Sequence, residues 1–170
     1  MLEQLTLDLD ASAPTWAAVI SPCGRYRYRL DRRWAAGPPI VWIMLNPSTA
    51  DSSTDDPTIR RIRAFSQVWG FGALTVVNLY AWRATDPREL WQALDPVGPE
   101  NDRYLAEAVS GVEVVAAWGA NARPDRITEV LALPGMGRVQ ALKVTKAGQP
   151  RHPLYLRSDL TPRPWENPNA

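Results

Sequence analysis

Residues 40–50, Ile-Val-Trp-Ile-Met-Leu-Asn-Pro-Ser-Thr-Ala, join an apolar run to a polar turn. An uninterrupted apolar run of this length is typical of a parallel strand that is buried on both faces of a sheet. Two similar runs follow at 74–80 and 112–118, and helical patterns separate the three. This alternation predicts an α/β fold, a three-layer α/β/α sandwich around a mainly parallel central sheet.

The helix expected after the first run carries clear start and stop signals. Asp55 or Asp56 can cap it, Pro57 suits its first position and Gly70 can end it. An apolar stripe at helical spacing is predicted to face the core, formed by Ile59, Ile62, Phe65 and Trp69. Further elements are expected as helices from 86, over 99–109 and over about 124–131, and as a strand over 139–144.

An N-terminal hairpin is expected ahead of the sheet, with strands at 16–20 and 25–30 around Ser-Pro-Cys-Gly. Strict alternation in the second strand predicts Arg25, Arg27 and Arg29 on one face. Tyr26 and Tyr28 then lie on the other face. The three arginines form either the solvated side of an edge strand or a ridge that contacts phosphates.

Length and composition indicate one globular domain over 1–170. We expect a tail at 1–14, an α/β core at 15–160 and a loosely ordered, proline-rich tail at 161–170. The chain is 45% hydrophobic and 22% charged, and its net charge of +1 gives no overall basic field that would indicate a nucleic-acid partner.

The chain has one cysteine, Cys23, which excludes an intramolecular disulfide framework and a cysteine-bound metal cluster. Its N-terminus lacks the basic and apolar regions of a signal peptide, and no apolar run reaches the length of a membrane span. We therefore expect a cytoplasmic monomer without a cofactor, a metal or a membrane partner.

Polar residues follow the predicted strands at the edge where α/β proteins bind ligands. Asn46, Asn78 and the turn Gly-Ala-Asn at 119–121 occupy such positions, and His152 follows the last strand. Each has a structural explanation, as a turn residue or a hydrogen-bonded core residue. Together they favour a functional pocket, because buried polar groups are costly unless they are paired. His152 is the only histidine, and imidazole titrates near neutral pH.

Several common chemistries lack their motifs. The sequence contains no Gly-x-Ser-x-Gly nucleophile turn and no Walker-type phosphate loop. With one histidine and one cysteine, a metal site would depend on Asp51, Asp55 and Asp56, which are better explained as helix-capping residues.

Four strings resemble a bacterial and phage family catalogued as domain of unknown function 1643. They are Asn-Pro-Ser-Thr-Ala-Asp (46–51), Asp-Pro-Thr-Ile-Arg-Arg (56–61), Val-Asn-Leu-Tyr-Ala-Trp-Arg-Ala-Thr-Asp-Pro (77–87) and His-Pro-Leu-Tyr-Leu (152–156). The resemblance covers most of the chain. The family label assigns no activity.

The order of strand, Asn-Pro, strand, Asn, and finally His-Pro is also similar to the uracil-DNA glycosylase superfamily. That resemblance implies that Asn46 orients the attacking water, Asn78 reads a flipped base and His152 stabilises the departing base. Asparagine in the first motif is similar to the mismatch-specific branch. The sequence departs from the superfamily because the first motif lacks glycines and the last reads His-Pro-Leu-Tyr.

The same resemblance implies further contacts. Tyr80 or Phe65 would stack on the base, and Leu154 or Tyr155 would enter the base stack as an apolar wedge. The residues that would contact DNA are Ser48, Thr49, Arg60, Arg61, Arg151, Leu154, Tyr155 and Arg157.

Three functions stay open at this point. The first is a DNA glycosylase that hydrolyses the N-glycosidic bond of a flipped base, in duplex or single-stranded DNA. The second is a module that recognises DNA or a modified base without turnover. The third is an enzyme that acts on a free nucleotide or nucleoside, in which case no coherent basic face is expected around His152.

Overall fold

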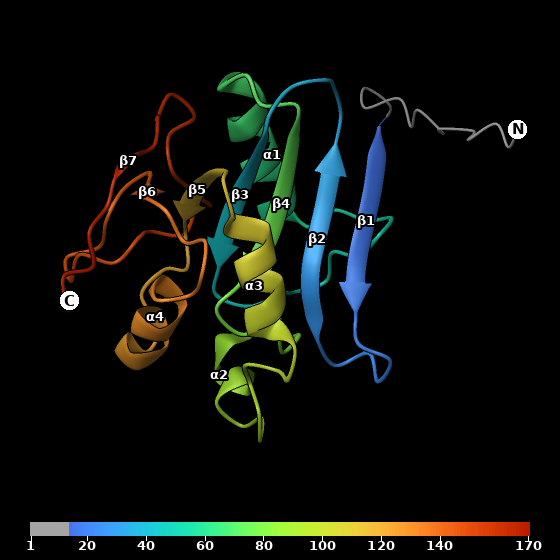
Figure 1. Cartoon of the computed structure of the whole chain (residues 1–170), viewed down its shortest axis with the longest axis vertical. Coiled ribbons are helices and arrows are strands. Elements are labelled where there is room, and N and C mark those ends of the chain that lie inside the picture. The colour runs from blue at the N-terminus through green and yellow to red at the C-terminus, as the bar shows by residue number, and fades with distance from the viewer. Residues whose placement is uncertain (1–13) are drawn as a thin grey trace, which may run out of the picture.

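The computed structural model describes residues 14–170, and the tail expected at 1–14 lies, except for Pro14, outside the described residues. Within them, a seven-stranded sheet and four helices form a mixed α/β fold (Figure 1). The strands are β1 (Thr15–Ile20), β2 (Arg27–Arg33), β3 (Pro39–Met44), β4 (Ala73–Asn78), β5 (Glu113–Ala116), β6 (Val139–Ala141) and β7 (Arg163–Pro164). The helices are α1 (Pro57–Val68), α2 (Pro87–Leu90), α3 (Asn101–Val109) and α4 (Pro124–Leu131).

The sheet is mixed, so the prediction of a mainly parallel sheet is corrected. Its strand order is β1-β2-β4-β3-β5-β6-β7. The pairs β4/β3, β3/β5 and β5/β6 are parallel, whereas β1/β2, β2/β4 and β6/β7 are antiparallel. The N-terminal hairpin is confirmed, but it extends the sheet by pairing β2 with β4. Sequence patterns do not show which sheet edge a hairpin joins, because backbone hydrogen bonds carry no sequence signal.

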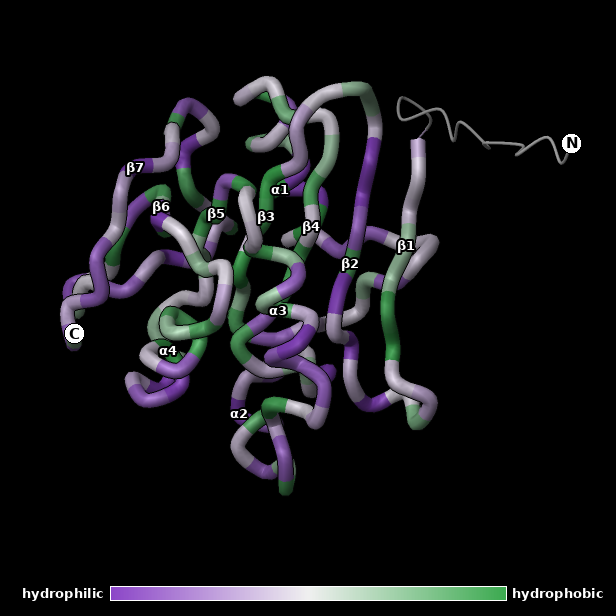
Figure 2. Tube along the Cα trace, viewed as in Figure 1, coloured by the Kyte–Doolittle hydropathy of each residue, from purple (hydrophilic) through white to green (hydrophobic). Residues whose placement is uncertain are grey.

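Helices pack against both faces of the sheet because the central strands are apolar on both. Ile40, Trp42 and Met44 of β3 belong to one buried cluster together with α1, whereas Val41 and Ile43 belong to a second with α3 and α4. Figure 2 shows hydrophobic residues along β3 and β4 and mainly hydrophilic ones along β2. None of the helices within residues 14–170 combines the length and apolar character needed to cross a membrane.

Helix α1 begins as its sequence signals predict. The Asp56 side chain accepts a hydrogen bond from the Ile59 amide at 2.9 Å, and Pro57 takes the first helical position. Ile59, Ile62 and Phe65 are buried beneath the helix. Helix α1 is thus capped by Asp56, whereas Asp55 forms an ion pair with Arg32 at 2.8 Å.

The arginines of β2 do not share one face, contrary to the prediction from alternation. The β1/β2 register shifts, so that Val19 and Ile20 pair with Arg29 and Arg27, two residues apart. Such a bulge interrupts the period of two. Arg27 is buried and donates to Ala50 ahead of α1, whereas Arg29 forms an ion pair with Asp31.

The C-terminal segment, expected to be loosely ordered, contributes to the sheet. Arg163–Pro164 form β7, which pairs with β6. Trp165 is buried, donates its indole N–H to the Gly148 carbonyl at 2.8 Å and packs edge-on against Trp118. The prediction from composition overlooked Trp165, whose side chain holds this segment against the sheet.

Candidate functional site

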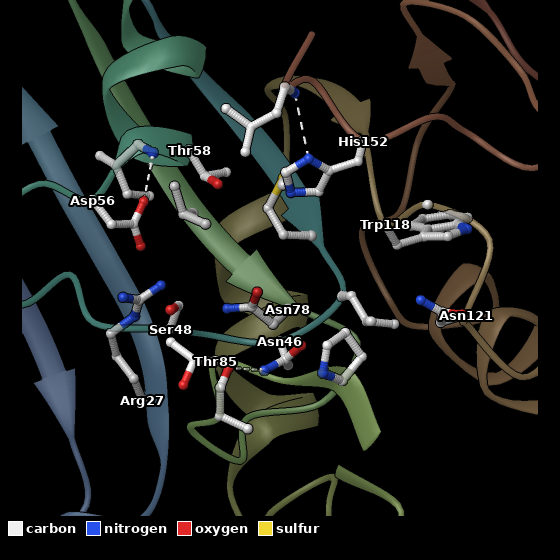
Figure 3. A pocket seen from close by; sticks show the side chains of 18 of the residues that line it. Arg27, Asn46, Ser48, Asp56, Thr58, Asn78, Thr85, Trp118, Asn121 and His152 are labelled. Atoms are coloured by element: carbon white, nitrogen blue, oxygen red, sulfur yellow. Dashed lines mark hydrogen bonds between the residues drawn. The ribbon is translucent and has the colours of Figure 1, made fainter. Parts of the chain in front are cut away.

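A cavity of about 420 Å³ lies at the carboxyl ends of β3, β4 and β5, beside the start of α1 (Figure 3). This volume is within the range of pockets that hold small molecules. Its lining comprises Arg27, Met44, Leu45, Asn46, Ser48, Asp56, Thr58, Ile59, Val76, Asn78, Ala84, Thr85, Pro87, Trp118, Gly119, Ala120, Asn121, His152 and Leu154.

The structure brings together the polar residues that follow the predicted strands. Asn46 follows β3, Asn78 ends β4, and the turn at 119–121 follows β5. His152 reaches the same cavity from the segment after β6. Parallel strands end at one sheet edge, so residues that are distant in the sequence lie around one space.

Asn78 is a buried residue whose side-chain amide lacks hydrogen-bond partners among the described residues. The residue is only 1% exposed, and neither its Nδ2 nor its Oδ1 has a hydrogen-bond partner within residues 14–170. Figure 3 shows this side chain among Asn46, Ser48 and His152 at the cavity. A buried amide without partners is costly, and a ligand with both a donor and an acceptor would remove that cost.

Two buried side chains hold the backbone on which Asn78 stands. Asn101 Nδ2 donates to the carbonyls of Asn78 at 2.9 Å and of Leu79 at 3.2 Å. Arg126 Nε donates to the same Leu79 carbonyl at 2.8 Å, and its guanidinium pairs with Asp102 at 2.5 Å. The end of β4 is therefore fixed from below the cavity.

Asn46 is oriented by backbone carbonyls. Its Nδ2 donates to Ala84 O at 2.8 Å and to Pro47 O at 3.1 Å. Since both partners are acceptors, the amide orientation is determined and Oδ1 is left to accept a hydrogen bond. Asn46 is thus a fixed acceptor at the cavity.

His152 is held in one tautomer. The Gly119 amide donates to Pro150 O at 2.8 Å, which ties this segment to the end of β5, and Gly119 has a φ of +79° that favours glycine. His152 Nδ1 accepts from the Leu154 amide at 3.3 Å, so the ring proton resides on Nε2. Burial lowers the pKa of His152, and the carboxylate of Asp56 opposes this only in part. The imidazole is therefore a neutral donor.

Arg27 and Asp56 bring charge to the cavity. Arg27 is 2% exposed and donates Nη1 to Ala50 O at 2.6 Å, while its Nε has no partner within the described residues. Burial lowers the pKa of Arg27 to about 10, and Asp56 opposes the shift. The guanidinium still carries its charge at neutral pH.

The aromatic residue at the cavity is Trp118, not the two residues predicted to stack on a base. Tyr80 packs edge-on against Trp91 in the core, and its hydroxyl accepts from the Arg123 amide at 3.3 Å. Phe65 packs against Trp69 beneath α1. Both predicted stacking residues are buried in the core away from the cavity lining.

The predicted DNA-contacting residues other than the arginines lie at three different places. Ser48 and Leu154 line the cavity. Thr49 lines an adjoining pocket together with Arg25 and Arg83, and this pocket shares Ser48, Ala84 and Thr85 with the cavity. Tyr155 is 100% exposed, and its φ of +66° is unusual for a residue other than glycine.

The remaining predicted contacts are arginines that differ in exposure and in the partners of their guanidinium groups. Arg151 is exposed beside His152. Arg60 is exposed and donates to Asp55 O at 2.7 Å, whereas Arg157 forms an ion pair with Asp159 at 2.6 Å. Arg61 is partly buried, donates to Leu156 O and packs over Phe65.

Several cavity residues were not predicted as site residues from the sequence, among them Trp118, Asp56 and Arg27. Trp118 and Asp56 had signals, because one follows a buried strand and the other caps a helix whose start faces that strand edge. Arg27 was one of three arginines interpreted as a possible phosphate-contacting ridge, but its place at the cavity was not predicted, because it depends on β2 running antiparallel to β4. Within residues 14–170 no group of three or more potential metal-ligating side chains is close enough to hold an ion.

Comparison with known families gives a match but no activity. A family model described as "Protein of unknown function (DUF1643)" matches residues 27–154, which contain strands β2 to β6 and the whole cavity lining. The chain therefore belongs to this family. No curated protein and no solved structure matches the chain.

Proposed function

We propose that this member of the DUF1643 family binds a nucleobase flipped out of DNA and hydrolyses its N-glycosidic bond. The observation that carries the proposal is the buried, unpartnered amide of Asn78 in a cavity at the strand ends. An amide offers a donor and an acceptor side by side, which matches the hydrogen-bonding edge of a base. Trp118 is among the residues that line the same cavity.

The two residues that flank Asn78 suit the hydrolysis. Asn46 Oδ1 would accept a hydrogen bond from the attacking water, since its Nδ2 is already bound to Ala84 O and Pro47 O. Water oxygen would bond to the sugar C1′ while the base leaves with the electron pair of the glycosidic bond. His152 Nε2–H would donate to the base oxygen on which negative charge develops. The water loses a proton as its oxygen bonds to C1′. This proton ends on the departed base, so the products carry no additional charge.

Arginines near the cavity support a DNA substrate. Arg151 adjoins His152, and Arg25 and Arg83 line the pocket that borders the cavity. Arginines in such positions bind phosphates and fix the register of a strand. Tyr155, fully exposed on a backbone of positive φ two residues past Pro153, would fill the gap left by the base. Under this proposal the protein has a uracil-DNA-glycosylase-like fold, in which Asn46, Asn78 and His152 follow one another along the chain.

The test is release of a base from oligonucleotides. Duplex and single-stranded substrates would carry uracil, mismatched, methylated, hydroxymethylated or deaminated bases, and alkaline cleavage would reveal abasic sites. We expect cleavage by the wild type and its loss in Asn46→Ala, Asn78→Ala and His152→Ala. Asn169→Ala, an exposed asparagine far along the chain, is the matched control and should behave as wild type.

Each outcome has a defined meaning. Cleavage that persists in all three variants would remove these residues from the mechanism. A second outcome is that the wild type binds DNA without cleaving it. If that binding depends on salt and is weakened in Asn78→Ala, the protein recognises a base and does not hydrolyse its bond. No cleavage and no DNA binding would indicate that the ligand of the cavity is a free nucleotide or nucleoside.

A further inference from the structure

We infer that the cavity takes a nucleobase joined to an anionic group, a phosphate or a carboxylate, and that Arg27 binds that group. This inference rests on the proposed nucleobase pocket and specifies its ligand more closely. It concerns the wall of the cavity opposite His152, which the proposed hydrolysis does not use (Figure 3).

The first argument is that Arg27 has too few partners for a buried cation. A guanidinium carries five N–H donors. Within the described residues, Arg27 directs one of its side-chain nitrogens, Nη1, to an acceptor, the Ala50 carbonyl, and its buried Nε has none. Burying a charge without a charged or hydrogen-bonded partner is strongly unfavourable, so an acceptor from a ligand would be favoured here.

The second argument is that no protein carboxylate fills this place. Asp56 is the acidic residue of the cavity lining, but it forms no ion pair with Arg27 within the described residues, and its Oδ1 accepts from the Ile59 amide. The Asp51 carboxylate is also occupied, since Oδ1 accepts from the amides of Ser53 and Thr54. Arg27 therefore presents positive charge to the cavity.

The third argument is position. Because β2 runs antiparallel to β4, the first residue of β2 lies beside the end of β4, and the Arg27 amide donates to Ala81 O at 3.0 Å. Asn78, the last residue of β4, lines the same cavity. A ligand with its base edge at Asn78 would therefore extend toward Arg27. The hydroxyls of Ser48 and Thr58 line the cavity as further donors.

The anionic group has two possible sources, which share this chemistry. A free nucleoside monophosphate would supply a phosphate, and a base with an acidic substituent would supply a carboxylate. A base with a neutral substituent would leave Arg27 without a charged acceptor.

The experiment is calorimetric titration of the full chain with three sets of ligands. These are the four deoxynucleosides, their 5′-monophosphates, and the 5-carboxy derivatives of deoxyuridine and deoxycytidine. We expect at least one anionic ligand to bind about tenfold tighter than its neutral parent, the gain typical of one hydrogen bond to a charged group. A gain from the monophosphates identifies a nucleotide, and a gain from the carboxy derivatives identifies an acid-substituted base.

Variants show whether Arg27 is the cause. Arg27→Gln should remove the gain while neutral nucleosides bind within about twofold of wild type, because only the charged contact is lost. Arg27→Lys should retain part of the gain, and Arg103→Gln, an exposed arginine of α3 paired with Glu100, should retain all of it. If Arg27→Gln does not fold, Arg27→Lys carries the test, because lysine keeps the charge but not the planar set of donors and should reduce the gain.

The inference and the proposed function fail in different ways. Equal binding of neutral and anionic ligands, with dependence on Asn78, overturns the role of Arg27 alone. A gain that depends on Arg27 without any release of bases from DNA overturns hydrolysis alone. Absence of binding by every free ligand overturns the inference and leaves hydrolysis to the oligonucleotide assay. A gain that Arg27→Gln leaves unchanged overturns the role of Arg27 alone.

Discussion

Arg27 and Arg32 lie on the same strand and are equally buried, yet their surroundings differ completely. Arg32 forms an ion pair with Asp55 at 2.8 Å and donates to four backbone carbonyls, those of Ala17, Asp31, Asp51 and Thr54. Arg27 donates to one carbonyl. Since both are cations removed from water, the difference separates a structural arginine from one that is available to a ligand.

The two buried asparagines repeat this contrast. Asn101 Nδ2 donates to two backbone carbonyls and fixes the end of β4, while its Oδ1 has no partner within the described residues. The Asn78 side chain has no partner within residues 14–170. Buried polar groups that lack partners are rare and call for an explanation. Arg27 and Asn78 line one cavity, whereas Arg32 and Asn101 are absent from its lining, which supports a shared role for the first pair.

The largest effect expected on stability is that of Arg32→Gln. Removing one partner of a buried ion pair costs about 3–5 kcal/mol, because the other charge is left buried. Arg27→Gln should cost at least about 2 kcal/mol less, since it removes one hydrogen bond and an unpaired charge. Urea unfolding monitored by circular dichroism measures both. Equal losses would show that Arg27 is as structural as Arg32.

The next effect separates the asparagines. Asn101→Ala should lower the free energy of unfolding by about 1–3 kcal/mol, because the carbonyls of Asn78 and Leu79 lose the hydrogen bonds from Asn101 Nδ2, although Arg126 Nε still donates to Leu79 O. Asn78→Ala should change it by less than about 1 kcal/mol, since it removes an amide that has no partner. Thermal unfolding of the two variants side by side is the measurement. A greater loss in Asn78→Ala would mean that its amide supports the fold.

A smaller effect is expected at the turn that ends β5. Gly119 has a φ of +79°, so Gly119→Ala should cost about 1–2 kcal/mol of backbone strain. Gly70, at the end of α1, has a φ of +87° with open space around it, and Gly70→Ala provides a matched strain away from the cavity. Both should lose similar stability in urea. Only Gly119→Ala should also weaken ligand binding. Equal binding by both variants would show that this turn does not contribute to the site.

The smallest effect is a pH dependence. Burial lowers the pKa of His152 in the folded chain below its ordinary value of 6.5. Because the unfolded chain then binds the proton more tightly, the stability linked to His152 is present above about pH 6.5 and is lost as the pH falls toward the folded pKa.

This dependence can be isolated with one variant. Urea unfolding between about pH 8 and 5.5 should show wild-type stability falling more steeply than that of His152→Gln. The carboxylates contribute equally to both profiles, so the difference belongs to the imidazole. Parallel profiles would contradict the lowered pKa.

Much of the fold could be predicted because its signals are local. Apolar runs identified β3, β4 and β5, and Asp56-Pro57 with the stripe of Ile59, Ile62 and Phe65 predicted α1 and its start. The convergence of Asn46, Asn78 and His152 followed from the rule that parallel strands end at one edge. The aromatic stacking residues were misplaced, since Tyr80 and Phe65 face the core, where apolar packing dominates.

The sequence by itself determined the central strands, the capped helix and the polar residues at the strand ends, because each depends on neighbours within one element. Only the tertiary structure decided that β2 pairs antiparallel with β4, that a bulge separates Arg27 from Arg29, and that β7 closes the far edge of the sheet. It also decided which buried polar groups have partners. Partners come from distant segments, so the difference between Arg27 and Arg32 is a property of packing and not of residue type.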